Sequence, residues 1–248
     1  MDKVAIVTGA SRGIGAAVSR MLGAAGYSVV VNYTRDVAAA AAVVQAVEKA
    51  GGKGLAVQAD VSREEDVLRL FGATDKAFGP VTALVNNAGM LNPQSRLVDM
   101  TADAVGRVLA VNVLGSILCA REAVRRMSTA HGGKGGGIVN LSSVAAKLGA
   151  PGEYIDYAAS KGAIDSFTIG LAKEVAAEGI RVNAVRPGII LTDIHASGGD
   201  PGRPERVRAT IPMQRAGTAE EVAEVIYWLL SGSASYVAGT IVEVTGGR

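Results

Sequence analysis

A tyrosine and a lysine stand four residues apart in Tyr157-Ala158-Ala159-Ser160-Lys161, and two serines precede them. Residues with this spacing share one face of a helix, so the phenol and the ammonium would lie together. Tyrosine has a pKa of about 10 and exchanges protons poorly at neutral pH, but a nearby ammonium favours the phenolate. With a serine hydroxyl opposite, such a pair can move a proton at an alcohol or carbonyl oxygen.

Either of two adjacent serines could supply that hydroxyl. The run from 138 to 142 has the character of a buried strand, and Ser143 is the first residue beyond it. We therefore expect Ser143 to hold the substrate oxygen, with Ser142 as the alternative. Tyr154 and Asp156 lie close to the tyrosine in sequence and could also meet substrate, although surface or interface positions are the favoured expectation for both.

The composition excludes several classes of protein. The chain has 248 residues, of which 49% are hydrophobic and only 4% aromatic, a mixture that suits close packing of helices on a sheet. The net charge is +2 and basic residues are scattered, so we expect no nucleic-acid partner. The one cysteine, Cys119, excludes an intrachain disulfide. We find no targeting segment and no apolar run of about 18 residues, and we expect a cytoplasmic protein with no membrane partner.

Short runs rich in Val, Ile and Ala alternate with longer helical stretches along the whole chain. The runs show little polar alternation, which is typical of parallel strands buried on both faces. They lie at 4–7, 28–32, 55–58, 83–86, 138–141, 181–185 and 240–244. The pattern predicts an α/β fold in which one domain, 1–248, is a doubly wound, parallel, seven-stranded sheet with helices on both faces.

Helix and loop boundaries carry their own signals. Helices are predicted over 36–50 and 153–178, each followed by glycine. Candidate helix caps are Thr101, Thr218 and Ser62, which has Glu65 three residues later as in a capping box. The segments 131–137 and 187–212 are predicted to be irregular, and we interpret 192–212 as a substrate loop.

A glycine-rich turn connects the first strand to the first helix. The sequence there is Thr8-Gly9-Ala10-Ser11-Arg12-Gly13-Ile14-Gly15. Glycines permit a tight turn and a close approach of backbone to phosphate, and the helix N-terminus offers free N–H groups and a positive dipole end. The spacing differs from G-x-G-x-x-G, and tight packing alone is the alternative explanation. Its position directly after the first strand favours a nucleotide site.

The end of the second strand indicates which nucleotide is bound. Proteins that select NAD commonly place an acidic residue there to bind the ribose 2′-hydroxyl, but this chain has Asn32. Arg35 follows nearby and Arg12 lies in the glycine turn, so two cations could attract a 2′-phosphate. We therefore expect NADP(H) to be preferred over NAD(H). Asp36 is the competing group, since it would favour NAD if it turned toward the ribose.

Seven motifs in one order resemble those of the short-chain dehydrogenase/reductase family over essentially the whole chain. The first three are T-G-x-x-x-G-x-G at Thr8–Gly15, Asp-Val at Asp60-Val61 and N-N-A-G at Asn86–Gly89. The next three are a helix asparagine at Asn112, a serine at Ser143 and Y-x-x-x-K at Tyr157 with Lys161. The last is P-G-x-I-x-T at Pro187–Thr192. The resemblance implies a Rossmann fold.

The resemblance also assigns roles to these residues. Tyr157 would be the general acid in reduction and the base in oxidation, Ser143 would orient the substrate oxygen, and Lys161 would lower the tyrosine pKa and hold the nicotinamide ribose. Asn112 would support the lysine through water. The residues implied to hold the cofactor are Gly9, Ser11, Arg12, Gly13, Ile14, Gly15, Asn32, Arg35, Asp60, Val61, Asn87, Ala88, Gly89, Tyr157, Lys161, Pro187, Gly188, Ile190 and Thr192. No metal is implied.

Within the family the chain resembles 3-oxoacyl-carrier-protein reductases and glucose dehydrogenases. The step from Ser143 to Tyr157 is one residue longer than the family's most frequent spacing, and the extra residue falls within 147–156, next to the expected substrate pocket. Glu178 stands where the carrier-protein reductases often have a basic residue, which puts an acyl-carrier partner in doubt.

The reaction we expect is the interconversion of a small-molecule carbonyl compound and a secondary alcohol, by hydride transfer to or from NADP(H). The alternative is a non-catalytic NADP(H)-binding sensor or scaffold, which would have no need of the complete Asn112, Ser143, Tyr157 and Lys161 set. The resemblance implies a homotetramer formed through the helices that begin near Thr101 and Glu153, and the small residues of these helices would allow close packing.

Overall fold

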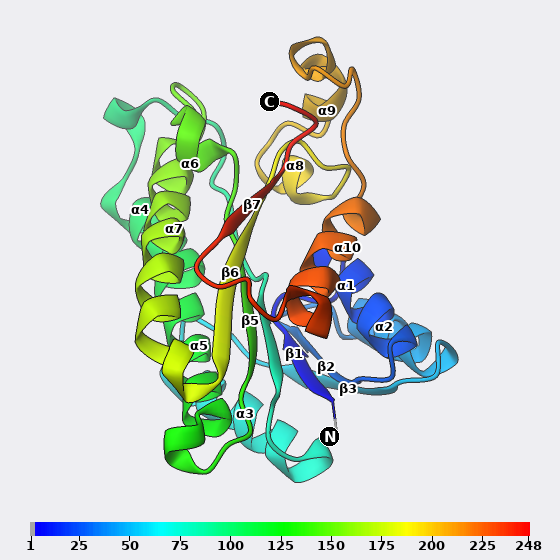
Figure 1. The fold of residues 1–248 in the computed structure, drawn as a ribbon. Coiled ribbons are helices and arrows are strands. Elements are labelled where there is room, and N and C mark those ends of the chain that lie inside the picture. The colour runs from blue at the N-terminus through cyan, green and yellow to red at the C-terminus, as the bar shows by residue number, and fades with distance from the viewer. Residues whose placement is uncertain (1–2) are drawn as a thin grey trace.

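The computed structural model describes residues 3–248 and confirms the predicted sheet. Seven strands, all parallel, stand in the order β3-β2-β1-β4-β5-β6-β7 (Figure 1). Their bounds are β1 Val4–Val7, β2 Ser28–Tyr33, β3 Lys53–Gln58, β4 Ala83–Asn86, β5 Gly136–Leu141, β6 Ile180–Pro187 and β7 Ile241–Val244. The strand order reverses between β1 and β4, and ligands of open α/β sheets bind outside the carboxyl ends of the strands at such a point.

Helices cover both faces of this sheet. Helices α1, α2 and α10 pack together on one face, and α3, α5 and α7 lie on the other (Figure 1). The longer helices are α1 Gly13–Ala24, α2 Val37–Lys49, α3 Glu64–Phe78, α4 Ala102–Leu109, α5 Gly115–Met127, α7 Ile155–Val175 and α10 Ala219–Leu230. Each face has its own apolar core, and β1 and β4 contribute side chains to both because they are buried throughout.

The predicted helix caps are correct in two cases and wrong in one. Thr101 accepts a hydrogen bond from the Ala104 amide, and Thr218 forms a complete capping box with Glu221. Ser62 does not cap α3, because its hydroxyl donates to Asp60 Oδ1 at 2.7 Å and the helix begins two residues later. The competing carboxylate two residues earlier therefore draws the serine into a local turn.

The helix between β4 and β5 contains an irregular turn. A π-helical turn over Ala110–Leu114 joins α4 to α5, so that Ala102–Met127 is one helical stretch of 26 residues. By length and composition this stretch could cross a membrane, with a mean hydropathy of 1.5 in its most apolar window. The sequence expectation concerned an uninterrupted apolar run, and this stretch is interrupted by Arg107, Asn112 and Arg121. A single such helix is weak evidence for a span, because core helices of water-soluble folds pass the same test.

The segment 187–212 is more ordered than its sequence predicts. After β6 it contains two single-turn helices, α8 Ile194–Ser197 and α9 Arg203–Arg206, and a 3₁₀ turn at Arg208–Thr210. These elements lie beyond the carboxyl ends of the strands, near the end of β7 (Figure 1). The short α6, Ala145–Leu148, stands across from them at the same edge.

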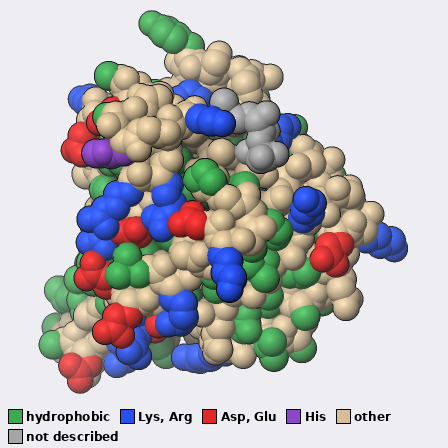
Figure 2. All heavy atoms as spheres, turned by 90° about the horizontal axis from the view of Figure 1, so that it is seen from below, with side chains coloured by type: hydrophobic (Ala, Val, Ile, Leu, Met, Phe, Trp, Pro, Cys, Tyr) green, Lys and Arg blue, Asp and Glu red, His purple; other side chains and the backbone are tan. Residues whose placement is uncertain are grey.

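Charged side chains of both signs share the surface on the opposite side. Figure 2 shows this face, where lysine and arginine side chains lie among aspartate and glutamate rather than in one basic block. The single cysteine, Cys119, is fully buried, and burial raises the pKa of its thiol to about 12.

Candidate active site

Glycines allow the turn after β1 to approach its neighbours closely. Gly9 and Gly13 have φ of +60° and +54°, a region that other residues rarely adopt. A Cβ on Gly15 would lie 2.6 Å from Asn87 Nδ2 and 2.7 Å from the Gly9 carbonyl oxygen. A Cβ on Gly9 would lie 2.9 Å from Ala88 Cα. Glycine is therefore required at both positions for this packing of the turn against the end of β4.

The N-terminus of α1 is left open by its own sequence. Arg12 occupies the cap position with extended backbone and forms no side-chain cap, and the first helical turn carries no acidic residue. The first amides of the helix therefore keep their N–H groups and the positive end of the helix dipole available to an anion. Ser11, Gly13 and Ile14, which belong to the same turn, are half-buried. This arrangement is a fitting cradle for a phosphate group.

Thr8 and Asn87 fix the turn to the end of β4. The Thr8 hydroxyl accepts hydrogen bonds from the amides of Asn87 and Ala88, at 3.0 and 2.9 Å. In return, Asn87 Nδ2 donates to the carbonyl oxygens of Thr8 and Gly9, at 2.8 and 2.9 Å. The N-N-A-G segment therefore holds the cradle in shape through its side chains as well as its backbone.

Asn32 does not occupy the role expected from the sequence. Its side chain is 1% exposed, its Oδ1 accepts from the Gly9 amide at 3.1 Å, and its Nδ2 donates to the Ala59 carbonyl at 3.0 Å. Because both ends of the amide are used inside the protein, Asn32 cannot reach a ribose with its side chain. It supports the glycine turn instead.

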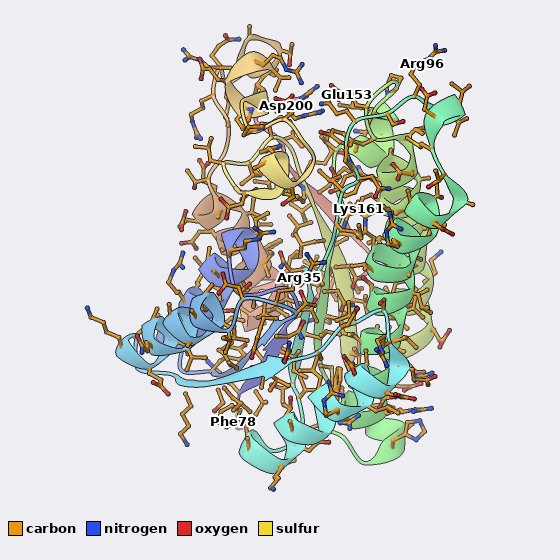
Figure 3. All side chains as sticks on the ribbon, turned by 180° about the vertical axis from the view of Figure 1, so that it is seen from behind. Arg35, Phe78, Arg96, Glu153, Lys161 and Asp200 are labelled. Carbon is orange, nitrogen blue, oxygen red and sulfur yellow. The ribbon has the colours of Figure 1, made fainter. Side chains whose placement is uncertain are left out.

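The residues just beyond Asn32 are the ones that face solvent at this edge. Arg35 is exposed, and Figure 3 shows it at the edge of the sheet near the end of β2. Asp36 caps α2 through a hydrogen bond from the Ala39 amide to its Oδ1 at 2.8 Å. Its carboxylate is therefore directed at the helix rather than at the turn. Arg12 extends toward α8, with its Nη2 3.4 Å from the Ser197 hydroxyl.

The remaining residues expected to bind the cofactor lie after β3 and β6, at the same carboxyl edge of the sheet as the glycine turn. The Asp60 carboxylate accepts from the amide and hydroxyl of Ser62, and Val61 is buried next to it. After β6, a Cβ on Gly188 would lie 2.8 Å from Thr245 Cα, which fixes Pro187 and Gly188 against the chain end. Ile190 is buried, and the methyl group of Thr192 lies against Gly13.

Ser143 and Tyr157 face each other beyond the end of β5. Burial raises the pKa of the Tyr157 phenol, and a hydrogen bond with the Ser143 side chain acts in the opposite direction. Ser143 is half-buried, whereas Ser142 is 3% exposed and its hydroxyl points to the Lys161 carbonyl at 3.4 Å. Of the two serines, Ser143 is therefore the one with its hydroxyl at the tyrosine.

Lys161 lies under the tyrosine ring, as the four-residue spacing predicts. Its Nζ is 5.5 Å from the centre of the Tyr157 ring and donates to the Leu141 carbonyl at 2.5 Å. Burial lowers the pKa of the ammonium to about 8, and the charge of Asp165 acts in the opposite direction. The pKa of Tyr157 nevertheless stands above its ordinary value, because burial outweighs the Ser143 hydrogen bond. The lowering of the tyrosine pKa that was expected from Lys161 is not seen in this structure.

Asn112 sits in the π-helical turn and is fully buried. Its Oδ1 accepts from the Met90 amide at 2.8 Å, and its Nδ2 donates to the Met90 carbonyl and to the Ser160 hydroxyl, at 3.1 and 3.0 Å. It therefore joins the segment after β4 to the helical turn that carries Lys161. A Cβ on Gly89 would lie 3.5 Å from Asn112 Oδ1 and 3.7 Å from Lys161 Nζ, so these three residues share one corner of the site.

Two residues near Tyr157 have roles that the sequence did not define. Asp156 is buried and accepts from Asn92 Nδ2 at 2.8 Å, so it faces the segment after β4. Tyr154 is also buried, and its hydroxyl donates to the Gly198 carbonyl at 3.2 Å. Arg203 stacks over the Tyr154 ring at 4.9 Å and pairs with Glu153 at 2.5 Å. Neither aspartate nor tyrosine is a surface residue, contrary to the favoured expectation.

The segment 192–212 closes this side of the site through such contacts. Figure 3 shows Glu153 and Asp200 at the same edge of the molecule, on the α7 side and on the 192–212 side, with Lys161 further along α7. Sequence reasoning missed the Glu153–Arg203 pair because the two residues lie 50 positions apart. Within residues 3–248, no group of three or more His, Cys, Asp or Glu is placed to hold a metal.

Comparison with known proteins identifies the family. The family model described as enoyl-(acyl carrier protein) reductase matches residues 9–248. The chain is 56% identical to the uncharacterized oxidoreductase YgfF of Escherichia coli over 99% of both chains. A Serratia marcescens short-chain dehydrogenase/reductase mutant is 33% identical with a TM-score of 0.91, over 99% of this chain and 97% of that one. A blue fluorescent protein from a metagenomic library, solved in complex with NADPH, is 34% identical with a TM-score of 0.90 over the same shares.

The family's members are oxidoreductases that act on small molecules with a nicotinamide cofactor. The all-parallel sheet, the glycine turn after β1 and the tyrosine–lysine pair on α7 fit this assignment. The protein described here therefore belongs to the short-chain dehydrogenase/reductase family.

Proposed function

We propose that the protein interconverts a carbonyl compound and a secondary alcohol with NADP(H), using Tyr157 as the general acid and base. One observation carries the proposal: the phenol of Tyr157 meets the Ser143 hydroxyl, with Lys161 Nζ under the ring. The open N-terminus of α1 and the glycine turn fit a dinucleotide phosphate at the same edge of the sheet. Bound there, the cofactor supplies or accepts the hydride.

The residues of the chain then handle the proton. In reduction, Tyr157 donates its proton to the carbonyl oxygen as negative charge develops there, and Ser143 donates a hydrogen bond to the same oxygen. A phenol with a raised pKa is protonated at neutral pH, which is the form that reduction requires. In oxidation the direction reverses, and the phenolate accepts the proton of the alcohol.

Lys161 and Asn112 hold this arrangement in place. The Lys161 ammonium stabilises negative charge on the tyrosine oxygen, and its location beside Gly89 leaves it next to the cofactor's expected path. Asn112 contacts Ser160 and the Met90 backbone rather than Lys161, so its side chain acts by fixing the two segments that flank the lysine. We assign Asn112 a positioning role on this basis.

The preference for NADP(H) rests on charge at the end of β2. Arg35 is exposed there and Arg12 projects from the glycine turn, while the carboxylate next to Arg35, that of Asp36, accepts a hydrogen bond from the Ala39 amide of α2. The structural relative bound to NADPH supports the same choice. A charge-assisted hydrogen bond contributes roughly 1.5–3 kcal/mol, which corresponds to about tenfold to a hundredfold in affinity.

Dissociation constants for both cofactors test this preference. Arg35→Ala should weaken NADPH by that factor and leave NADH nearly unchanged, because NADH lacks the 2′-phosphate. Lys53→Ala is a matched control, since it removes an exposed cation from the start of β3, at the other end of the sheet. Wild-type binding of NADH as tight as NADPH would contradict the assignment.

We also propose that the protein is a homotetramer that associates through α4, α5 and α7. Leu109, Leu114, Ile117 and Ile169 are each at least 37% exposed on these helices and their connecting turn. A second copy of the chain would cover such apolar side chains. Light scattering should give the mass of four chains, and Leu114→Glu combined with Ile117→Glu should reduce it. A monomeric wild type would exclude the proposal.

The reaction itself is tested by mixing enzyme-bound NADPH with a panel of diketones and ketoesters. A decrease in NADPH absorbance within a single turnover, dependent on Tyr157, is the expected result. Tight NADPH binding without oxidation by any panel member would favour a sensor or scaffold.

A further inference from the structure

Four alternating charges run from α6 to α7 behind the active-site lysine. Lys147 Nζ lies 2.8 Å from Glu243 Oε1, and Arg186 Nη1 lies 2.6 Å from the same oxygen. Arg186 Nη2 lies 2.6 Å from Asp165 Oδ2. The series crosses β7 and β6 and ends at Asp165, four residues after Lys161 on α7. With that spacing, Asp165 and Lys161 share one face of the helix.

The inner pair of this series is buried and incompletely bonded. The Asp165 and Arg186 side chains are only 14% and 12% exposed, whereas Lys147 is 55% exposed. Asp165 Oδ1 is buried and finds no hydrogen-bond partner among residues 3–248, and the same is true of Arg186 Nε. Burying charge costs free energy that a pair recovers only when its remaining polar atoms are satisfied. The ion pair therefore contributes little to the stability of the packing between α7 and β6. A second role would explain why the two charges are buried there.

The surroundings of Lys161 offer few other charges. On α7, Tyr157 stands one turn before the lysine and Asp165 one turn after it. From β5 the Leu141 carbonyl accepts a hydrogen bond from Nζ, and from the π-helical turn Asn112 lies nearby, and both groups are neutral. Burial favours the neutral amine, and the charge that opposes burial is that of Asp165.

We infer that Asp165 is a positioning residue that keeps Lys161 charged in the buried site, and that Arg186 holds the Asp165 carboxylate in place and moderates its effect. The inference rests on the proposed function, in which the charge of Lys161 stabilises negative charge on Tyr157. Asp165 touches neither substrate nor cofactor in this account, and it acts only through the lysine.

Opposite substitutions in the one ion pair separate this role from a structural one. Asp165→Asn removes a negative charge near Lys161, so the lysine should lose its proton at lower pH. Arg186→Gln removes a positive charge from the same pair, so the lysine should keep its proton to higher pH. Both variants break the ion pair between Asp165 and Arg186, and Arg186→Gln also loses the bond to Glu243. A merely structural pair would respond to both substitutions in the same direction. We expect the pH at which Lys161 loses its proton to shift by about half a unit or more in each variant.

Two readouts follow the lysine. The first is the alkaline limb of kcat/KM for ketone reduction, which should move down for Asp165→Asn and up for Arg186→Gln. The second needs neither cofactor nor substrate: the NMR chemical shift of the Lys161 side-chain Cε followed against pH, which does not require a reagent to reach the buried amine. Asp165→Glu should keep both pH profiles close to those of the wild type, because it keeps the negative charge. Asp75→Asn should also leave both profiles unchanged, because it breaks an ion pair with Arg126 that joins α3 to α5, away from Lys161.

The outcomes are distinguishable. NMR titration midpoints that move in opposite directions support the inference even if no substrate is reduced, in which case the proposed function alone fails. Midpoints that stay fixed, or that move together in both variants, would overturn the inference, whatever the activity. If Asp165→Asn does not fold, Arg186→Gln decides by itself, because a fixed or lowered midpoint contradicts the account.

Discussion

The two ends of the site are held by different kinds of contact. At the nucleotide end, buried amides and backbone groups fix the glycine turn: Asn32 and Asn87 bond to it from β2 and from the end of β4, and Gly15 packs without room for a methyl group. At the substrate end, the part of segment 192–212 nearest α7 is held by side-chain contacts between partly exposed groups, such as Arg203 with Glu153. Contacts of the first kind are rigid, and those of the second kind can open at small cost.

This difference suits a reaction in which the cofactor is held in one fixed geometry while substrate enters and product leaves. The cradle for the phosphates belongs to the core of the sheet, so its shape is set when the protein folds. The segment over the substrate carries two single-turn helices. Polar contacts tie its first part to α7, and its last part is anchored by Val207 and Ile211, which pack with Ile189 in a small apolar cluster. Substitutions at the two ends should therefore fail in different ways.

The largest effect is expected at the nucleotide end. Gly15→Ala places a methyl group 2.6 Å from Asn87 Nδ2 and must push α1 away from the end of β4. We expect a loss of about 1–3 kcal/mol in the free energy of unfolding and no measurable NADPH binding at concentrations that saturate the wild type. Denaturant titration and fluorescence binding measure the two.

Gly106→Ala is the matched control for this substitution. Gly106 lies within α4, a Cβ there would meet nothing within 4 Å, and its φ is not positive. It should leave NADPH binding intact and stabilise the fold by up to about 1 kcal/mol. Tight NADPH binding by Gly15→Ala would show that the cradle is more adaptable than its contacts indicate.

A second effect concerns the free energy of unfolding, which the buried Lys161, between the nucleotide end and the substrate end, is expected to lower. The pKa of Lys161 is lowered from 10.5 to about 8, so the charged form is disfavoured in the folded state. Below pH 8 the folded protein carries this penalty in full, and the penalty is relieved as pH rises from about 8 toward 10.5. Lys161→Met should therefore stabilise the apo protein at pH 7, by about 2 kcal/mol after allowance for the lost hydrogen bond.

The gain from Lys161→Met should shrink as the denaturation experiments move to higher pH. Lys173→Met, at an exposed position near the end of the same helix, should change stability little at any pH. A variant that is less stable than the wild type at pH 7 would show that Lys161 contributes more through its contact with Leu141 than burial costs.

The smallest effect is expected at the substrate end. Arg203→Met removes the ion pair with Glu153 and the contact with the Tyr154 ring. The segment 192–212 should then exchange its amide hydrogens about fivefold faster, in line with a loss of about 1 kcal/mol, while the strands β1 and β4 remain unchanged. Reduction should slow only a few-fold, with NADPH affinity intact.

Arg208→Met tests whether this response is specific. Arg208 lies in the same segment but makes no contact with α7 among the described residues: it pairs with Glu205, three residues away, donates to the Gln214 carbonyl at 2.9 Å, and is 55% exposed. Exchange and activity should remain at wild-type values in that variant. Equal acceleration in both variants would mean that the segment is loosened by any loss of charge, and that the Arg203 contacts have no special part in closing it.

Much of this organisation could be predicted from the sequence, because the elements that build it are local. The apolar runs at 4–7 and 83–86 became β1 and β4 with the predicted bounds, and Thr101 and Thr218 cap the helices that follow them. What the sequence did not reveal depends on competition or on distance. Ser62 has a good cap sequence but bonds to Asp60, which stands two residues earlier.

Distance explains the remaining differences. The π-helical turn at Asn112 is not visible in the local pattern, because it depends on contacts with Met90 and Ser160. The role of Asn32 depends on distance in the same way. Asn32 lies near the end of β2, as expected, but its side chain accepts from the amide of Gly9, which follows β1 and is 23 residues away in the sequence.

The central claim is that Tyr157 transfers the proton while the nucleotide end binds its cofactor independently. Single-turnover oxidation of bound NADPH by a reactive diketone, in the wild type and in Tyr157→Phe, tests it most directly. The account predicts equal NADPH affinity in both proteins and a rate lower by roughly 10²–10⁴ in the variant, since only the titrating oxygen is removed. A variant that retains more than about a tenth of the wild-type rate would contradict the assignment of Tyr157 as the acid.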